Sequence, residues 1–423
     1  MHRRQLLRGL ATGLAAGTLG ACGTGERLAS LPEKLRSAAS FHALPANTRL
    51  VLDTTDDDRM ARIAVAALRR ELDYAGRSGI KDLPPAVYLA ISGGGENGAY
   101  GAGVLTAWSE VGTRPVFKAV TGVSTGALIA PFAFLGSAYD KDLERFYTTI
   151  DKSQVMVSRG LISGVLGDSL YDSTPLLRTI RGALTPELVA AIGKEYAEKG
   201  RLLFVATTNL DVPVGVLWNI GGIAASGNKD APELIAKILL ASASIPGALP
   251  PVMIDLEAGG QRFQEMHVDG GAVAQVVLYP PSFTAQDLLE AAGPDNRQLL
   301  QAVAHRQRSF YVIRNSRPGP DFETVDRSTL KIASRAVSTL ISTQGIGDLY
   351  QLYVVCQRDH IDYHVSYISE GFTEKLNDSF DRAYMNRLYQ FGRRQMLDGK
   401  AWSKYPPGYN PTPFSHIKTM LPN

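Results

Sequence analysis

Two glycine-rich segments carry residue types suited to acyl-transfer chemistry. Gly122-Val123-Ser124-Thr125-Gly126 follows a strand-like run and precedes an apolar helical stretch. A serine on such a sharp strand-to-helix turn presents its hydroxyl above the sheet, where it acts as a nucleophile. Gly93-Gly94-Gly95-Glu96-Asn97-Gly98 also joins a strand-like run to a helical stretch. Backbone N–H groups at such a helix start favour negative charge.

Neither segment alone decides the function. A lone GxGxxG pattern also occurs in dinucleotide-binding loops and tight turns, and a lone GxSxG pattern arises by chance. Here the two occur together, each in the strand-to-helix context that its chemistry requires. A serine nucleophile beside a backbone anion site is the combination used in acyl transfer, so the pair predicts such a site.

A third segment, His267-Val268-Asp269-Gly270-Gly271, places an acidic residue at the end of a strand-like stretch. With the three segments in this order, the chain resembles the patatin-like phospholipase family over residues 86–276. The resemblance implies a lipid acyl hydrolase with a Ser–Asp dyad, in which Ser124 is the nucleophile and Asp269 its base. It also implies an oxyanion hole built from the backbone amides of Gly94 and Gly95. The other motif glycines are Gly93, Gly98, Gly122, Gly126, Gly270 and Gly271.

One position departs from the family pattern. Many members carry Arg or Lys immediately before the last glycine of the first segment, where this chain has Asn97. We therefore expect a modest loss of preference for anionic substrates and no loss of the chemistry. Three further stretches give weaker support for the resemblance: Leu170-Tyr171-Asp172, Ala206-Thr207-Thr208-Asn209 and Ala241-Ser242-Ala243-Ser244-Ile245-Pro246.

The order of the expected elements indicates an α/β fold. Strand-like runs at 86–91, 117–121, 202–207 and 216–219 alternate with helical runs at 101–112, 124–135, 140–150 and 234–243. Strands separated by helical crossovers imply a mainly parallel sheet covered on both faces. The resemblance implies the same architecture, a three-layer patatin-like fold with a mainly parallel central sheet flanked by helices. Functional loops of such a sheet gather at the carboxyl ends of its strands, where both glycine-rich segments fall.

The chain divides into five expected segments. These are a signal peptide at 1–21, a tether at 22–48, a helical extension at 49–85, a catalytic core at 86–282 and a C-terminal extension at 283–423 that packs on the core. The last contains strand-like runs at 310–313 and 361–368 and helical runs at 328–358 and 380–396. Residues 156–169 combine apolar side chains with glycines, which suits a lid or acyl-chain wall and equally a loop packed in the core.

Two polar residues near the predicted site have open roles. His267 lies two positions before Asp269, so on a strand both side chains point to the same face. His267 is therefore either a third catalytic member or a neighbouring histidine with a satisfied structural role. Asp172 is another acidic candidate, for which capping of a loop is the simpler role.

Two further functions stay open beside the dyad. An α/β-hydrolase esterase with a Ser–His–Asp triad needs a histidine after the acid, and His305, His360, His364 and His416 all follow Asp269. A lipoprotein that has kept the fold only to bind lipid or a partner is the non-catalytic alternative. The glycine-rich segment near the start of the predicted core and the Asp269-Gly270-Gly271 sequence favour the dyad over the triad. The intact motifs argue against the non-catalytic hypothesis.

Composition excludes several other classes of function. The 423 residues include 44 Lys and Arg against 41 Asp and Glu, and Arg3, Arg4 and Arg8 account for the excess. The rest of the chain has no basic stripe of the kind that binds nucleic acid. The seven histidines and two cysteines show no metal-ligand spacing, so neither a metal nor another cofactor is predicted. Cys356 lies in an apolar run and is expected to be a buried thiol.

The N-terminus predicts export. It has a basic start, an apolar stretch at 10–19 and small residues before Cys22. Leu19-Gly20-Ala21-Cys22 resembles the lipobox of bacterial lipoproteins, and Arg3-Arg4-Gln5-Leu6-Leu7-Arg8 resembles a twin-arginine signal. An uncleaved N-terminal anchor is the alternative, although the apolar stretch is short for a bilayer core of about 30 Å. We expect a protein held by a lipid on Cys22 in the bacterial cell envelope, on the periplasmic side of the outer membrane. Its substrate there is a lipid or fatty-acyl ester.

Replacement of Cys22 tests the lipoprotein assignment. Cys22→Ser should leave an unprocessed precursor, because the lipid is attached through the thiol of this residue. Intact-mass analysis of the membrane fraction should show a wild-type chain that begins at an acylated Cys22. A wild-type chain that still begins at Met1, or one that begins at Cys22 without acyl mass, contradicts the assignment.

Overall fold

A computed structural model of the chain describes residues 27–41, 44–45, 48–53, 56–79, 82–160, 167–294, 297–301, 303–319, 322, 324–376 and 378–412. The predicted signal peptide, Cys22 and the middle of the 156–169 segment lie outside these residues.

Within this described part, nine strands form one sheet. Seven follow the order β1 (Arg49–Val51), β7 (Val214–Asn219), β6 (Leu202–Asn209), β3 (Ala119–Val123), β2 (Ala86–Ile91), β10 (Arg308–Arg314) and β11 (Asp362–Tyr367). The hairpin of β8 (Val252–Ala258) and β9 (Gln261–Asp269) joins the sheet through pairing of β9 with the end of β6. A separate small sheet pairs β4 (Val157–Ser158) with β5 (Tyr171–Asp172).

The centre of the sheet is parallel. Strands β6, β3, β2, β10 and β11 all run in the same direction, and Ile91 lies opposite Gly122 in the register of β2 and β3. The two glycine-rich segments therefore leave the sheet side by side at its carboxyl edge. The expected strand at 216–219 is β7, which runs antiparallel to β6 because their short connection leaves no room for a crossover. The prediction of a mainly parallel sheet is confirmed.

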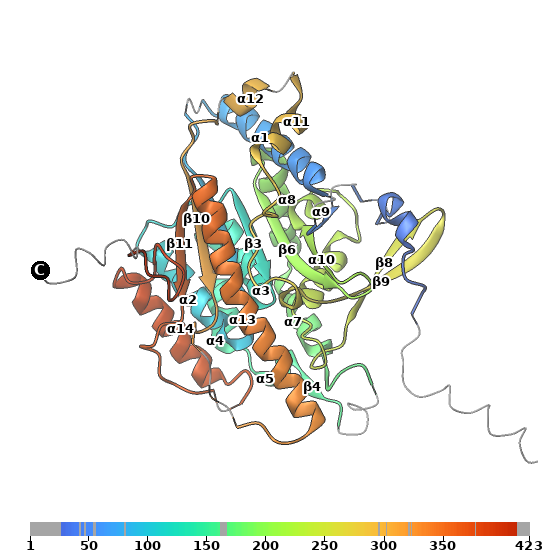
Figure 1. The fold of residues 1–423 in the computed structure, drawn as a ribbon, viewed down its shortest axis with the longest axis vertical. Helices are drawn as coiled ribbons and strands as arrows, with labels where there is room; N and C mark the ends of the chain where they lie inside the picture. Colours follow the sequence, from blue (N-terminus) through green and yellow to red (C-terminus); the bar gives the residue numbers. More distant parts are fainter. Residues whose placement is uncertain are drawn as a thin grey trace, which may run out of the picture.

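One face of the sheet is covered by a large layer of helices (Figure 1). This layer consists of α2 (Gly98–Glu110), α3 (Thr125–Leu135), α4 (Asp140–Thr149), α7 (Thr174–Ala183), α8 (Pro186–Lys199), α9 (Ile220–Ala224), α10 (Ala231–Ser242) and α14 (Arg382–Leu397). Leu89 and Ile91 of β2 pack into it. The expected helices near 101–112, 124–135, 140–150 and 234–243 correspond to α2, α3, α4 and α10.

The opposite face carries α1 (Asp57–Arg77), α11 (Ala285–Ala292) and the C-terminal half of α13 (Thr329–Arg358) (Figure 1). Ala90 of β2 packs with Leu349 and Leu352 of α13, on the side away from Leu89 and Ile91. Successive strand residues point to opposite faces, so a strand that is apolar throughout requires helices on both sides. The three-layer α/β fold is confirmed. The short elements are η1 (Glu33–Ala38), η4 (Gly95–Asn97), η5 (Ser137–Tyr139), η6 (Gly270–Ala272), α5 (Lys152–Val155) and α12 (Arg297–Gln301).

Residues 27–41 pack on the core, although they belong to the segment 22–48 that the sequence predicts to be a tether. Leu31 and Phe41 are buried, and Ser40 exchanges backbone hydrogen bonds with Glu257 of β8. Arg27 donates two hydrogen bonds to Asp211 at 2.7 and 2.8 Å. Leu31 and Phe41 explain the difference, because burial of their apolar surface stabilises a docked segment.

Segments on both sides of the expected 86–282 core also supply strands to the main sheet. β1 comes from the segment expected to be a helical extension, and β10 lies between β2 and β11. The C-terminal segment is therefore part of the central layer as well as of the outer ones.

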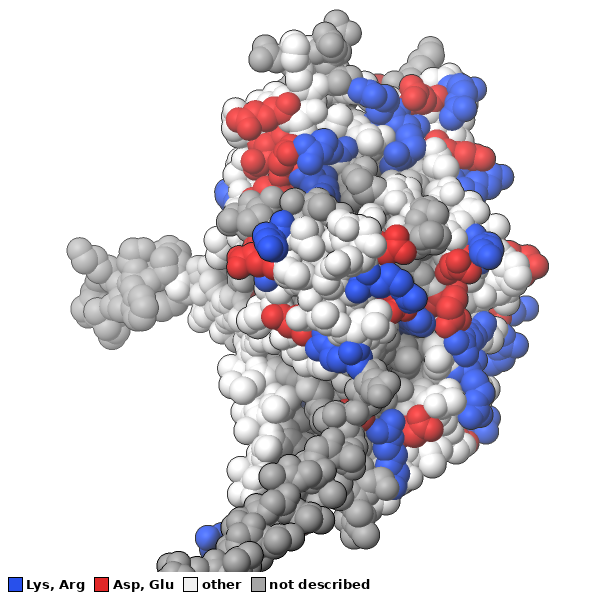
Figure 2. All heavy atoms as spheres, turned by 90° about the vertical axis from the view of Figure 1, so that its right-hand side faces the viewer, with Lys and Arg blue, Asp and Glu red and all other residues white. Residues whose placement is uncertain are grey.

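The surface carries charges of both signs. On the face shown in Figure 2, acidic and basic side chains are interspersed. Ion pairs such as Arg181 with Glu233, at 2.6 Å, join neighbouring helices. Among the described helices, none combines the length and the apolar character needed to cross a bilayer.

Helices α2 and α14 approach each other unusually closely. A Cβ atom on Gly103 of α2 would overlap the backbone carbonyl of Tyr389, and one on Gly392 of α14 would overlap that of Tyr100. Thr106 and Tyr389 join the helices through a hydrogen bond of 2.9 Å between their hydroxyls. α2 begins directly after the first glycine-rich segment, so this contact with α14 fixes the helix that follows the predicted anion site.

Addition of one methyl group to α2 tests this contact. Gly103→Ala should destabilise the fold by about 1–3 kcal/mol, because the overlapping atoms belong to the backbone of α14 and cannot rotate away. Gly76→Ala in α1 is the matched control, since a Cβ there meets nothing within 4 Å. Thermal unfolding of both variants should show a loss only for Gly103→Ala. Equal unfolding temperatures would contradict the close contact.

Candidate active site

Ser124 occupies a strained turn between β3 and α3. Its φ of 55° and ψ of −125° lie in a region that residues with a side chain rarely adopt. β3 ends at Val123 and α3 begins at Thr125, so the hydroxyl stands at the carboxyl edge of the sheet. A Cβ on Gly126 would overlap the carbonyl of Ile91, which is why glycine is needed two residues after the serine. The turn has the geometry expected of a nucleophile elbow.

Ser242 holds this turn in place. The backbone N–H of Ser124 donates to the Ser242 hydroxyl at 2.9 Å, and that hydroxyl donates to the carbonyl of Ala206 at 2.6 Å. Ser242 is buried and lies at the end of α10, and Ala206 belongs to β6. The sequence placed Ser242 only in a stretch of softer family resemblance, since nothing local to it signals a contact with residue 124.

Asp269 lies at the end of β9, opposite Thr207 of β6. Its buried carboxylate accepts a hydrogen bond of 2.7 Å from the Gly271 N–H, and it lines the same cavity as Ser124. Burial raises the pKa of Asp269 to about 6, although the nearby Ser124 side chain and the Gly271 N–H favour the charged form. A carboxylate with this pKa is a better proton acceptor than an exposed aspartate and is still ionised at neutral pH.

The first glycine-rich segment lies beside Ser124. A Cβ on Gly93 would lie 3.0 Å from Cβ of Ser124. Gly94 has a φ of 152°, and a Cβ on it would overlap the carbonyl of Asn315. Outside regular helices and strands of the described chain, the N–H groups of Gly94 and Gly95 donate no hydrogen bond. Both amides are thus available for an oxyanion, as the resemblance implies.

Asn315 forms hydrogen bonds with residues on both sides of the first glycine-rich segment. It directly follows β10, is fully buried, and donates from its side-chain amide to the Ser92 carbonyl at 2.9 Å. Its backbone N–H donates to the Ser92 hydroxyl at 2.8 Å, and its side-chain oxygen accepts from the Gly101 N–H at 3.1 Å. Sequence reasoning missed Asn315, because the residue lies far along the chain in a segment without a motif.

A cavity of about 340 Å³ joins these groups. Of the predicted site residues, Gly93, Gly94, Gly95, Ser124 and Asp269 line it, together with Asn97. The other motif glycines do not line the cavity, and a Cβ on each would come within 2.7 Å of a neighbouring atom; they are Gly98, Gly122, Gly126, Gly270 and Gly271. β10 and α13 complete the wall with Arg314, Ile341 and Ser342.

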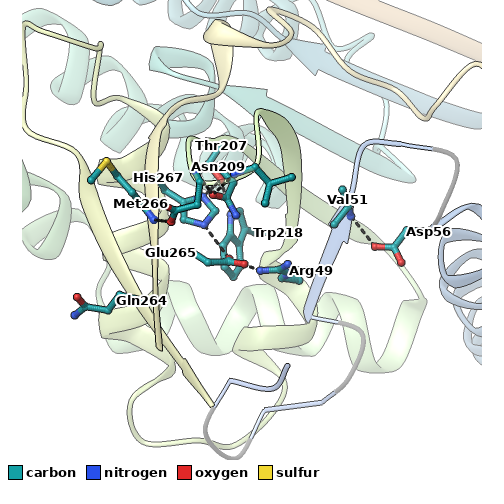
Figure 3. A network of polar contacts seen from close by, with 12 residues as sticks. Arg49, Val51, Asp56, Thr207, Asn209, Trp218, Gln264, Glu265, Met266 and His267 are labelled. Carbon is teal, nitrogen blue, oxygen red and sulfur yellow. Dashed lines mark hydrogen bonds and ion pairs between the residues drawn. The ribbon is translucent and has the colours of Figure 1, made fainter. Parts of the chain in front are cut away.

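His267 belongs to a separate network (Figure 3). Its ring is fully buried, with Nδ1 2.9 Å from the Thr207 hydroxyl and Nε2 3.2 Å from Glu265. Arg49 of β1 pairs with the same Glu265. Burial lowers the pKa of His267, so the neutral form is favoured. His267 does not line the cavity, which favours the structural role over the catalytic one.

The remaining candidates also lie apart from Ser124. Asp172 accepts hydrogen bonds of 3.0 and 2.8 Å from the N–H and hydroxyl of Thr174, at the start of α7. None of the described histidines that a triad would need, His305, His360 and His364, lines the cavity, and His416 lies outside the described residues. Cys356 is buried, as expected, and burial raises the pKa of its thiol to about 12.

Residues 89–280 match the model of the patatin-like phospholipase family. This segment is a patatin-like domain. It contains both glycine-rich segments and Asp269, in the order that the resemblance requires. A patatin-like domain supports a lipid acyl hydrolase in general. The domain ends before β10, so Arg314 and Asn315 reach its cavity from outside the matched residues.

No curated protein sequence matches the chain. Among solved structures, the chain is similar to VipD from Legionella pneumophila, with 12% identity, coverage of 75% of this chain and 67% of VipD, and a TM-score of 0.36. It is also similar to human GIVD cytosolic phospholipase A2 in complex with methyl γ-linolenyl fluorophosphonate, with 12% identity, coverage of 72% and 50%, and a TM-score of 0.23. The chain thus spans half the length of the human protein.

The buried carboxylate predicts an unusual dependence of stability on pH. The folded-state pKa of Asp269, about 6, is above the value of an unfolded aspartate, so stability falls as pH rises between about 4 and 6. Asp269→Asn removes this penalty, which is on the order of 3 kcal/mol, and keeps an oxygen to accept from Gly271. The variant should unfold at a higher temperature than wild type at pH 8 and at an equal temperature near pH 4.

Asp211→Asn is the matched control for this measurement. Hydrogen bonds from Arg27 and from the Met266 N–H lower the pKa of Asp211 despite its partial burial. Its replacement should therefore lower the unfolding temperature at pH 8, opposite in sign to Asp269→Asn. If Asp269→Asn also lowers it, the Asp269 carboxylate stabilises the fold and the proposed burial cost is absent.

Proposed function

We propose that the protein is a serine lipid acyl hydrolase that uses Ser124 and Asp269 as a dyad. The observation that carries the proposal is that Ser124 on its strained turn and the buried Asp269 carboxylate line one cavity together with the glycine-rich segment. The patatin-like domain supports a lipid ester as the substrate class. Apolar side chains in the cavity wall, Ile245 and Ile341, are suited to contact an acyl chain.

The acylation step follows from this arrangement. As Ser124 Oγ attacks the ester carbonyl carbon, its proton passes to the Asp269 carboxylate in the same cavity. The carbonyl oxygen becomes an oxyanion, and the amides of Gly94 and Gly95 donate to it. Loss of one such donor costs about 3–4 kcal/mol of transition-state stabilisation in comparable sites. Protonated Asp269 then donates its proton to the departing alkoxide, which leaves as an alcohol.

Deacylation uses the same groups in reverse order. A water molecule attacks the acyl-serine carbonyl and gives its proton to Asp269, and the new oxyanion occupies the same amide site. The tetrahedral intermediate collapses, and the proton returns from Asp269 to Ser124 as the fatty acid leaves. No histidine is required for either step.

We further propose that the protein acts at a membrane of the bacterial cell envelope, anchored by a lipid on Cys22 and facing the periplasm. The export-like residues before Cys22 support this placement. An enzyme held at the bilayer surface meets its apolar substrate at high local concentration, and a lipid anchor makes a spanning helix unnecessary.

A covalent serine probe tests the dyad. Ser124→Ala should lose labelling by a fluorophosphonate and lower ester hydrolysis by about three orders of magnitude, since the nucleophile is gone. The matched control is Ser334→Ala, an exposed serine on α13 outside the cavity wall. Mass spectrometry of the labelled peptide and hydrolysis of p-nitrophenyl esters and phospholipids give the two readouts. Labelling of Ser124→Ala at wild-type level would refute Ser124 as the nucleophile.

A further inference from the structure

A buried arginine lines the same cavity as the proposed dyad. Arg314 is the last residue of β10 and is only 2% exposed, yet its side chain forms part of the cavity wall. It lies outside the residues that match the patatin-like family, and no motif marks it in the sequence. The proposed acylation and deacylation steps do not use it.

The guanidinium of Arg314 has few partners. Its Nη2 donates to the Ser342 carbonyl at 3.3 Å, and its buried Nε has no hydrogen-bond partner in the described chain. No carboxylate of the described residues lies within ion-pair distance. The Asp348 carboxylate acts on Arg314 only from a greater distance, and it accepts from the backbone N–H groups of Gln275 and Val276 at 2.6 and 3.4 Å.

Burial without a close partner has an electrostatic cost. It lowers the pKa of Arg314 to about 10, so the side chain is still charged at neutral pH. Buried polar groups almost always have hydrogen-bond partners, and a buried charge without one is costly. An anion in the cavity would provide the missing acceptor and restore the lost solvation energy.

The position of Arg314 relative to Ser124 restricts which anion fits. A Cβ on Gly345 would lie 2.8 Å from Nη1 of Arg314 and 3.1 Å from Cγ of Gln275. A Cβ on Gly93 would lie 2.7 Å from Oε1 of Gln275 and 3.0 Å from Cβ of Ser124. The Gln275 side chain thus lies between the guanidinium and the nucleophile, which places the two groups at neighbouring points of one cavity.

We propose that Arg314 binds the phosphodiester of a glycerophospholipid while Ser124 attacks its acyl ester. This inference rests on the proposed function, because the ester must reach Ser124. In a glycerophospholipid the phosphate and the scissile ester are carried by the same glycerol, so one cavity holds both. A guanidinium presents a planar fork of donors that matches two phosphate oxygens. Arg314 then supplies, from β10, the cationic contact that Asn97 does not supply from the glycine-rich segment.

The experiment compares two substrates that differ in the phosphate. Dioleoylphosphatidylcholine and dioleoylglycerol are offered in identical detergent micelles to the wild-type full chain and to Arg314→Gln and Arg314→Lys. Arg314→Gln should lower kcat/KM for the phospholipid by about 10- to 100-fold and change kcat/KM for the diacylglycerol less than threefold. Arg314→Lys keeps the charge but not the fork, so it should fall between wild type and Arg314→Gln.

Two controls separate binding from folding. Arg308→Gln changes an exposed arginine at the other end of β10 and should leave both substrates unaffected. The unfolding temperature of Arg314→Gln should equal or exceed that of wild type, because a buried charge with few partners is removed. An equal loss on both substrates, or a lower unfolding temperature, would make Arg314 a structural residue and overturn the proposal.

A fatty-acid carboxylate is the other anion that hydrolysis produces in this cavity. If Arg314→Gln weakens inhibition of diacylglycerol hydrolysis by oleate but leaves the ratio between the two substrates unchanged, Arg314 binds the product and the phosphodiester proposal is wrong.

A binding measurement separates this proposal from the proposed function. In Ser124→Ala, a dialkyl ether analogue of phosphatidylcholine should bind at least tenfold more tightly than the matching dialkylglycerol. The addition of Arg314→Gln should abolish the difference. If wild type hydrolyses neither ester while this preference persists, the hydrolase proposal fails and the phosphate site stands. If the preference is absent, the phosphate site fails, whatever the hydrolytic activity.

Discussion

The backbone conformation of Ser124 is the constraint on which the site depends. A residue with a side chain adopts such dihedral angles at a cost of about 1–3 kcal/mol, and only where its surroundings enforce them. Here they are enforced from three elements: Ser242 of α10 accepts the Ser124 N–H, β3 fixes the preceding residue, and Gly126 lets α3 start against the Ile91 carbonyl of β2. The nucleophile is therefore positioned by the sheet and its helices, and its own side chain needs only to reach Asp269.

The site is completed by a strand from the far end of the chain. The patatin-like domain supplies the nucleophile, the acid and the glycine-rich segment, whereas β10 places Arg314 and Asn315 against them. Pairing of β10 with β2 makes this possible, because parallel neighbours end at the same edge of the sheet. The cavity is therefore lined both by residues of the patatin-like domain and by residues that follow it in the chain.

The sequence predicted the parts of the molecule that local chemistry determines. The glycine-rich turns, the alternation of strands with helices and the long helix near 328–358 all leave local signals, and the structure contains them. Helices α7 and α8 were missed, although Ser173-Thr174-Pro175 and Thr185-Pro186 are start signals for helices. Ser242, Arg314 and Asn315 had no such signal, since their roles arise from contacts between distant segments. The polar composition of residues 22–48 predicts a tether, and no local signal in the sequence indicates that Leu31 and Phe41 are buried.

The network around His267 links the first strand of the sheet to the strand that carries the acid. Arg49 of β1 pairs with Glu265, and Glu265 contacts His267 (Figure 3). Asp269 follows His267 by two residues on β9. A recombinant chain trimmed to the matched domain would lose Arg49 and leave a buried glutamate without its cation, a loss that costs about 3–5 kcal/mol in comparable buried pairs. The N-terminal residues are therefore part of the smallest unit that can be expected to fold with an intact site, and an expression boundary is best placed before Arg27.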